Sequence, residues 1–153
     1  MFKDLLHIFR HSSFHERIIK SILYLEKSAR IKLFYKILRK LVNQRIYHCE
    51  IHPDSFRSLE AIITLSLPHP YFIVIHRKVS IGINCRIFQG VTIGSTEKLG
   101  EELDLAYIGD NVMIGVKSTI LGSVKIGNNV RIGAHTLVLN DVEEGKTAVG
   151  LWK

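Results

Sequence analysis

Histidine is the side chain of this sequence best suited to proton transfer near neutral pH, because imidazole titrates at a pKa of about 6.5. Four histidines stand among turn residues, at positions 52, 69, 76 and 135. His69 differs from the others because a proline precedes it and another follows it, which makes the backbone rigid on both sides. A purely structural scaffold has no need of such a residue. His69 is therefore the candidate general base, and we expect the other three in turns or structural positions.

Other catalytic arrangements are missing from the sequence. The two cysteines, Cys49 and Cys85, form no CxxC pair and stand in no His/Cys cluster, so we expect no metal and reduced thiols. Neither a Ser-His-Asp arrangement nor a phosphate-binding loop is present. No stretch of about 18 uncharged apolar residues suggests a transmembrane helix, and the N-terminus does not resemble a signal peptide.

The second part of the chain repeats every six residues. From residue 75 the blocks are IHRKVS, IGINCR, IFQGVT and IGST, and from residue 108 they are IGDNVM, IGVKST, ILGSVK, IGNNVR, IGAHTL and VLNDVE. Isoleucine or valine opens all ten blocks, and the fifth position is small or apolar. This period predicts a parallel β-helix in which three blocks form one triangular coil and the first position points inward. A sandwich of alternating strands would not keep one phase over so many blocks.

The repeat is interrupted once, between Ile93 and Ile108. Residues 95–107, STEKLGEELDLAY, must leave the β-helix as a polar, acidic loop. Long loops on compact scaffolds are more often functional than decorative. We therefore expect this loop to form a wall of a binding site.

Composition divides the chain into two parts. Residues 1–46 carry 11 Lys/Arg and 3 Asp/Glu, a net charge of +8, and contain no glycine. The remaining residues carry 10 Lys/Arg and 11 Asp/Glu, a net charge of −1. Apolar residues at helical spacing predict helices at about 2–10, 14–27 and 30–44. The expected organisation is a basic helical segment, 1–46, followed by a β-helix domain, 47–153.

The hexapeptides resemble those of the bacterial hexapeptide-repeat acyltransferases, which form left-handed parallel β-helices. The stretch LPHPYFIVIHRKVSIGINCRIFQGVTIGS, residues 67–95, is similar to the serine acetyltransferase-like branch, especially its members that acetylate capsular or exopolysaccharide sugars. In that branch a histidine opens the first regular coil, and His69 occupies its place. An acid precedes an Ile-His-Pro sequence in the family, and Glu50 precedes Ile51-His52-Pro53 here.

The resemblance implies direct acetyl transfer from acetyl-CoA. His69 would take the proton from an acceptor hydroxyl, and Glu50 would orient the imidazole and stabilise its cation. The family binds acetyl-CoA between the subunits of a homotrimer, mostly through backbone groups at small-residue turns. The matching residues are Gly94, Ser95, Thr96, Gly115 and Gly133, and Lys117 could meet CoA phosphates. For these glycines a simple conformational need is an equal alternative.

The acceptor expected from the resemblance is a sugar hydroxyl in polysaccharide biosynthesis. Serine acetyltransferases carry an Asp before the catalytic histidine and an Arg-His pair late in the loop, where this sequence has Pro68 and Asp104-Leu105. Without those charges a zwitterionic serine has little to pair with. Two alternatives stay open: a serine O-acetyltransferase of cysteine biosynthesis, and a non-catalytic β-helical oligomerisation scaffold.

The basic helices allow three interpretations. They present a solvated face while packing on the β-helix or another subunit, or they contact an anionic membrane surface weakly, or they bind nucleic acid. No recognition motif supports nucleic acid. We expect a cytoplasmic protein that can lie peripherally at the inner membrane face.

Overall fold

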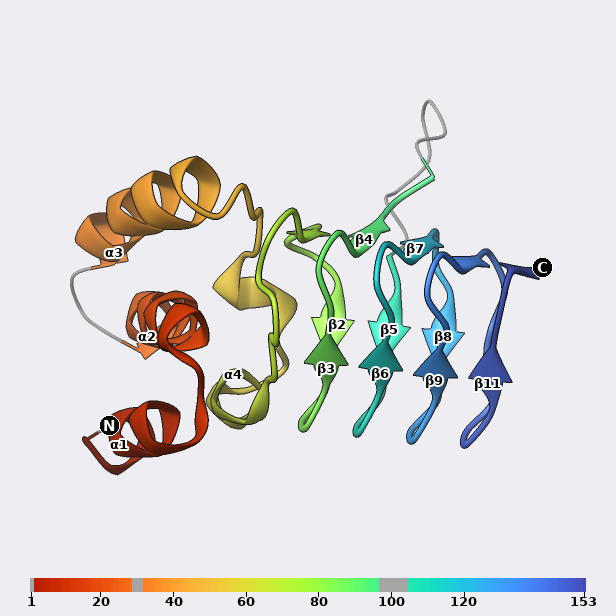
Figure 1. The fold of residues 1–153 in the computed structure, drawn as a ribbon, viewed down its shortest axis with the longest axis horizontal. Coiled ribbons are helices and arrows are strands. Elements are labelled where there is room, and N and C mark those ends of the chain that lie inside the picture. The colour runs from red at the N-terminus through yellow and green to blue at the C-terminus, as the bar shows by residue number, and fades with distance from the viewer. Residues whose placement is uncertain (1, 29–31, 97–104) are drawn as a thin grey trace.

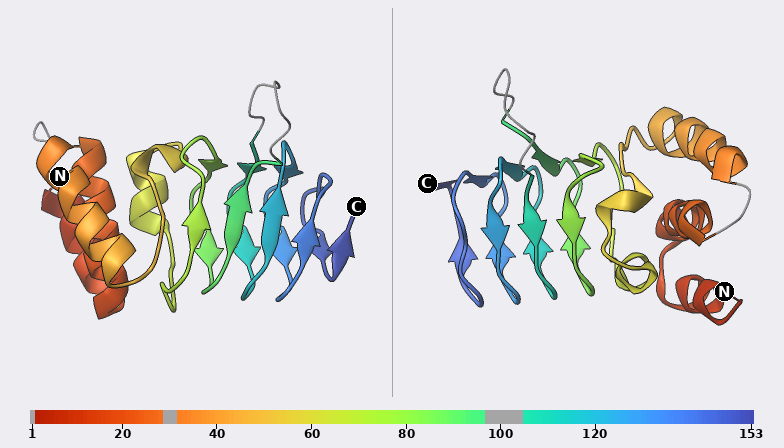
Figure 2. Two further views of the ribbon diagram at one scale, coloured as in Figure 1. Left: turned by 90° about the horizontal axis from the view of Figure 1, so that it is seen from above. Right: turned by 180° about the vertical axis from the view of Figure 1, so that it is seen from behind.

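The structure is a computed structural model that describes residues 2–28, 32–96 and 105–153. Helices occupy one end of the molecule and a column of β-coils extends from them to the C-terminus (Figures 1 and 2). The helical elements are α1 (Phe2–His11), α2 (Phe14–Ser28), α3 (Lys32–Arg39), the π-helical turn η1 (Lys40–Gln44), the 3-10 turn η2 (Pro53–Ser55) and α4 (Leu59–Thr64). The three predicted helices are confirmed, whereas η2 and α4 were not foreseen.

The strands are two or three residues long and pair only in parallel. They are β1 (Val74–Ile75), β2 (Ser80–Ile81), β3 (Arg86–Ile87), β4 (Thr92–Gly94), β5 (Tyr107–Ile108), β6 (Met113–Ile114), β7 (Thr119–Leu121), β8 (Lys125–Ile126), β9 (Arg131–Ile132), β10 (Leu137–Val138), β11 (Thr147–Ala148) and β12 (Leu151–Trp152). Three sheets result: face A (β1-β4-β7-β10-β12), face B (β2-β5-β8) and face C (β11-β9-β6-β3). This is the predicted left-handed parallel β-helix.

The hexapeptide register is confirmed by burial. All ten block-opening residues, from Ile75 to Val138, are at most 1% exposed. Ile75 pairs with Ile93, and Ile108 pairs with Ile126, so equivalent residues stack one coil apart. The small fifth position is buried as well, including Cys85, whose pKa burial raises to about 11. Stacked aliphatic side chains therefore form one continuous core along the β-helix.

One incomplete coil precedes the regular ones. Glu50 bridges to Val74 on face A, Phe56 bridges to Ile81 on face B, and Ser66 bridges to Arg86 on face C. Between Phe56 and Ser66 the chain inserts α4, which Ser58 caps by accepting a hydrogen bond from the Ala61 N–H. The extra residues between the candidate acid and the candidate histidine are therefore taken up at the corner between faces B and C.

Cations of the N-terminal segment hold the helices to the first coil. The buried Arg39 pairs with Glu26 at 2.7 Å. Lys27 donates to the carbonyls of Pro53 and Phe56, and Lys20 donates to the carbonyl of Leu65 at 2.6 Å. The segment's charge is therefore not simply a solvated face, because several cations bind acceptors inside the chain.

The apolar stripe of α3 is oriented differently from what its periodicity suggests. Leu33, Phe34, Ile37 and Leu41 are between 51% and 71% exposed, while Arg39 faces inward. A stripe of this kind leaves apolar area in water unless another surface covers it.

Lys20 gives the fold a distinct pH dependence. It is 4% exposed, and burial lowers its pKa from 10.5 to about 8. Between these two values the unfolded chain binds more protons than the folded one, so stability rises with pH. We expect Lys20 to add about 1 kcal/mol to the free energy of unfolding between pH 8 and pH 9, seen as the difference between wild type and a variant without this amine. Urea denaturation at both pH values measures it.

The Lys20→Met variant provides the control for this effect. Burial raises the pKa of Cys49 and Cys85 from 9.0 to about 11, so both thiols already oppose Lys20 between pH 8 and pH 9, where the unfolded chain begins to ionise them. Subtracting the variant's free energy of unfolding from that of wild type at each pH cancels the contribution of the two thiols. If the free energy of unfolding changes equally with pH in the two proteins, Lys20 is not the source of the pH dependence.

Candidate functional site

The first two coils bring the candidate acid and the candidate base to the same corner of the β-helix. Glu50 lies in a short bridge beside β1, with its N–H donating to the Ile73 carbonyl at 2.8 Å. His69 lies in the turn that leads from face C into β1. The thiol of Cys49 donates to the Pro70 carbonyl at 3.0 Å, which ties together the residues next to Glu50 and His69.

Both side chains of this candidate pair are exposed. In the part of the chain that the structure describes, no hydrogen bond or ion pair joins Glu50 and His69. Catalytic hydrogen bonds are often long in a protein without substrate and tighten when the complex forms. The fold thus brings the two segments together and leaves the imidazole accessible from solvent.

A cleft of about 420 Å³ opens along face A between the helices and the coils. Glu50, His52 and His76 line it together with Gly94 and Ser95. Arg39, Lys40 and Arg77 contribute cations to the same lining. Glu50 and part of the predicted CoA-binding turn therefore share one cleft, which the sequence alone could not establish.

The two histidines of this cleft have local partners that explain them. The Nδ1 atom of His52 accepts a hydrogen bond from the Asp54 N–H, and that of His76 accepts one from the Lys78 N–H. Burial, followed by the charge of Arg39, lowers the pKa of His52. Both therefore cap turns, as the sequence suggested, and His52 is disposed to stay neutral at the cleft.

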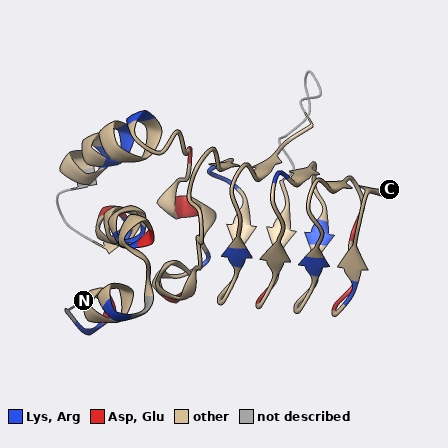
Figure 3. Ribbon diagram, viewed as in Figure 1, with Lys and Arg blue, Asp and Glu red and all other residues tan. Residues whose placement is uncertain are grey.

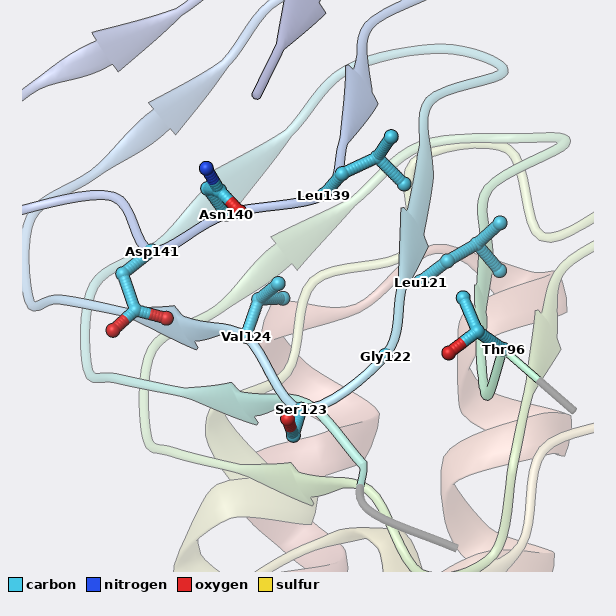
Figure 4. Close-up of a pocket in the computed structure, with 8 residues that line it drawn as sticks. All are labelled: Thr96, Leu121, Gly122, Ser123, Val124, Leu139, Asn140 and Asp141. Atoms are coloured by element: carbon cyan, nitrogen blue, oxygen red, sulfur yellow. The ribbon is translucent and has the colours of Figure 1, made fainter. Parts of the chain in front are cut away.

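A second hollow continues along the same edge over the later coils (Figure 4). Its volume is about 710 Å³, and Thr96, Leu121, Gly122, Ser123, Leu139 and Asp141 are among its lining residues. Gly94, Ser95 and Thr96 thus border two adjoining hollows. A Cβ atom at Gly94 would meet only Leu121 at 3.8 Å, so packing does not require glycine there.

The other predicted CoA residues lie at the opposite edge of face A. Gly115 and Gly133 turn the chain from face C toward face A, and Lys117 follows in the same turn as Gly115. A Cβ at Gly115 would approach the Ala134 nitrogen to 2.7 Å, and one at Gly133 would approach Val149 to 2.9 Å. Close contact between coils therefore accounts for these two glycines. The structure does not bring them together with Gly94–Thr96 within one chain.

Part of the predicted loop, residues 97–104, lies outside the described residues. Ser95 and Thr96 begin it and Leu105 and Ala106 end it, while Tyr107 already belongs to β5. The phenol of Tyr107 accepts a hydrogen bond from Arg57 at 2.7 Å, and Arg57 also pairs with Asp110. The base of the loop is therefore fixed to the edge of face B.

Face A carries no charge on its regular strands. Its outward residues after Glu50 are aliphatic or threonine: Val74, Thr92, Thr119, Leu137 and Leu151. Face C carries Arg86 and Arg131 instead, which appear as blue strands β3 and β9 in Figure 3, and face B carries Lys125. Of the three faces, face A is the one most suited to contact another protein surface.

Sequence reasoning missed two residues beside this site. His48 and Phe72 lie at the same corner as His69, and their rings stack with centroids 5.4 Å apart and planes at 7°. No local pattern marks them, because they are 24 residues apart and meet only when one coil lies on the next.

The described residues show no metal centre and no membrane span. Within 2–28, 32–96 and 105–153 there is no group of three or more His, Cys, Asp or Glu side chains that could hold a metal ion. In the same residues no helix has the length and apolar character needed to cross a bilayer.

Known proteins resemble this chain along most of its length. The family described as bacterial transferase hexapeptide (six repeats) matches residues 106–140. A serine acetyltransferase of Staphylococcus epidermidis is 41% identical over 104 residues, which cover 67% of this chain and 46% of the relative. The chain spans about half the length of the curated relatives it matches.

Two solved structures extend the similarity to the fold. The soybean serine acetyltransferase apoenzyme superposes with a TM-score of 0.71 at 27% identity, covering 96% of this chain and 63% of the other. A serine acetyltransferase in complex with CoA gives a TM-score of 0.68 at 28% identity, covering 89% and 53%. The chain is thus a hexapeptide-repeat protein of the bacterial transferase family. Within that family it is similar to the serine acetyltransferases, in sequence and in fold.

Proposed function

We propose that the protein is an acetyl-CoA-dependent O-acetyltransferase with a sugar hydroxyl as its acceptor. One observation carries the proposal: the bridge of Glu50 lies beside the turn of His69, at one edge of face A. The opposite edge of the same face bears Gly94–Thr96. Similarity to serine acetyltransferases, one of them solved in complex with CoA, supports the cofactor and the reaction.

The exposed imidazole of His69 acts as general base. Its free nitrogen accepts the proton of the acceptor hydroxyl while the oxygen attacks the thioester carbonyl. The tetrahedral intermediate then expels the thiolate of CoA, which takes the proton back from the imidazolium. Glu50 serves as the positioning acid, stabilising the cation that forms transiently on His69. The step needs neither a covalent enzyme intermediate nor a metal.

The choice of a sugar over serine rests on the residues around His69. Pro68 stands where a serine enzyme of this branch carries an acid, and Leu105 occupies part of its Arg-His position, so the charges that would hold a zwitterion are missing. Serine remains the second candidate acceptor, because the relatives at 39–41% identity are serine acetyltransferases.

The complete site requires a second subunit in this proposal. His69 and Gly94–Thr96 lie at opposite edges of face A, so one chain alone does not bring them to a single cleft. In a cyclic trimer, one edge of face A in each subunit lies against the opposite edge of face A in the neighbouring subunit. The uncharged strands of face A supply a surface that such contacts can bury. We therefore include a homotrimer with parallel β-helix axes in the proposal.

A thiol-release assay tests the proposed reaction. Purified protein receives acetyl-CoA together with a panel of monosaccharides and nucleotide sugars or with L-serine, and free CoA is followed by its reaction with a chromogenic disulfide. Release above the hydrolysis background with a sugar supports the proposal. Release with serine alone selects the second candidate. Absence of acetyl-CoA binding in a calorimetric titration would instead select the non-catalytic scaffold.

The helical segment suggests where the enzyme works. We propose that residues 1–46 hold it loosely at an anionic membrane, because α3 exposes Leu33, Phe34 and Ile37 beside the exposed cations Lys36 and Lys40. Each cation near such a surface contributes about 1 kcal/mol within a Debye length.

Vesicle co-sedimentation checks the membrane proposal. We expect binding to phosphatidylserine-containing vesicles at low salt, loss of binding at high salt, and none to neutral vesicles. The Lys36→Glu/Lys40→Glu variant should bind more weakly than a Lys125→Glu/Arg131→Glu control on faces B and C. If the intact protein stays in the supernatant with anionic vesicles at low salt, the helices are packing elements only.

A further inference from the structure

One corner of the β-helix is turned by left-handed residues in five successive coils. Each lies two positions before the outward strand residue of face A, with φ between 51° and 70°: His48, Phe72, Gly90, Lys117 and His135. Backbone hydrogen bonds of 2.8–3.2 Å link each turn to the preceding one in the same pattern. These five residues therefore form one in-register stack along the edge, which we call the corner column.

Of the five residues in the corner column, Phe72 has the side chain least compatible with a left-handed backbone conformation. A bulky side chain at φ 57° is an outlier, whereas glycine takes such a conformation without strain, as Gly90 does in the next coil. The Phe72 side chain is 62% exposed, so burial within the chain does not compensate for the strain. Strain of this kind gathers at functional sites, where a side chain is retained for what it binds.

The ring of Phe72 has one covered face and one open face. On one side it stacks on His48, at 5.4 Å and 7°. On the other side the next residue of the corner column is Gly90, which has no side chain. A Cβ placed there would meet the Lys117 Cγ at 2.9 Å, so the stem of Lys117 leans over Gly90. The second face of the Phe72 ring therefore has no side chain from the next coil's own corner residue beside it.

Polar groups that bind hydroxyls lie at the His48 end of the platform. Gln44, His48 and Glu50 line a hollow of about 400 Å³ together with Cys49 and Val74. His69 precedes Phe72 by three residues in the same turn. A pyranose ring offers an apolar face of C–H groups for stacking on an aromatic ring, and hydroxyls at its rim that suit amide, carboxylate and imidazole groups.

We propose that the His48–Phe72 pair is the platform on which the acceptor's pyranose ring stacks, and that the absence of a side chain at Gly90 keeps the neighbouring corner position from crowding the Phe72 ring. The inference rests on the proposed function and specifies its acceptor site. Serine has no ring to stack, so the platform selects a sugar over an amino acid. The turn geometry places the stacked ring in the same corner as the imidazole that activates its hydroxyl.

Saturation-transfer NMR on the full chain, without acetyl-CoA, tests the platform directly. The probes are the methyl glycosides of glucose, galactose, mannose and N-acetylglucosamine, with L-serine as the non-sugar probe. We expect ring protons of at least one glycoside to receive saturation and L-serine to receive none. Phe72→Leu should weaken binding of that glycoside about tenfold. Gly90→Asn, which tolerates the left-handed turn and places a side chain next to Phe72 in the corner column, should weaken it as well.

A matched control separates stacking from general loss of an exposed ring. Phe9 on α1 is 54% exposed, and Phe9→Leu should bind the glycoside like wild type. Sedimentation of each variant reports whether the assembly persists. If Phe72→Leu also disrupts the assembly, Gly90→Asn in the intact assembly decides between stacking and subunit packing.

Three results would overturn the platform: no glycoside binds, Phe72→Leu binds as wild type does, or Gly90→Asn in an intact assembly binds as wild type does. Because the measurement contains no acetyl-CoA, it is independent of catalysis. Glycoside binding without any acetyl transfer would leave the platform standing and overturn the proposed reaction instead.

Discussion

Replacing His69 with alanine is expected to slow acetyl transfer about 10²–10⁴-fold, the usual contribution of a general base. The His69 side chain is exposed, and its turn is held by backbone hydrogen bonds such as that from the Tyr71 N–H to its carbonyl at 2.8 Å. The substitution therefore removes a proton acceptor and little packing, so the thermal unfolding midpoint should stay near that of wild type. Thiol release at saturating acetyl-CoA measures the loss.

Two further variants make this result specific. His135→Asn alters another exposed histidine at the same edge, three coils away, with a residue that accepts its positive φ of 56°, and should retain activity. Glu50→Gln should cost less than His69→Ala, because an orienting acid contributes less than the base it orients. A His69→Ala enzyme with wild-type turnover would remove His69 from the mechanism.

A charge placed in the middle of face A is expected to dissociate the proposed trimer and abolish activity with it. Thr119 occupies the central strand of the five-stranded sheet, is half-buried in the single chain and has aliphatic or threonine neighbours on both sides. Thr119→Lys would place an unpaired ammonium group in each subunit interface, where desolvation of the charge is not repaid. Sedimentation velocity should show a monomer at micromolar concentration, with thiol release near background.

Face C offers a matched control for this experiment. Met113 points outward from β6 and is half-buried like Thr119, but its strand neighbours are Arg86 and Arg131. Met113→Lys should leave both the trimer and the activity intact. If Thr119→Lys still sediments as a trimer with full activity, face A is not the surface through which the subunits meet.

The structure changes how the N-terminal charge is interpreted. From sequence, +8 over 46 residues looks like one basic surface. The structure divides it, because Arg39 pairs with Glu26, and Lys20 and Lys27 bind backbone carbonyls of the first coil. Only the cations that remain exposed, such as Lys36 and Lys40, are available to a membrane.

The sequence by itself determined the β-helix, its register and the three N-terminal helices that precede it. A six-residue period is a local property repeated in each coil, so Ile75, Ile93 and Ile120 identify the inward face without any knowledge of the partner coil. The helices follow in the same way from a local period. His69 also stood out locally, through its two prolines.

Only the tertiary structure decided which side chains meet across coils. Helix α4 absorbs the extra residues between Glu50 and His69 at a different corner, so a longer sequence gap does not separate their segments. The stacking of His48 on Phe72 joins residues 24 apart, and the open face of Phe72 depends on a glycine 18 positions further on. Such contacts depend on the length and turn of every intervening coil, which a local pattern does not encode.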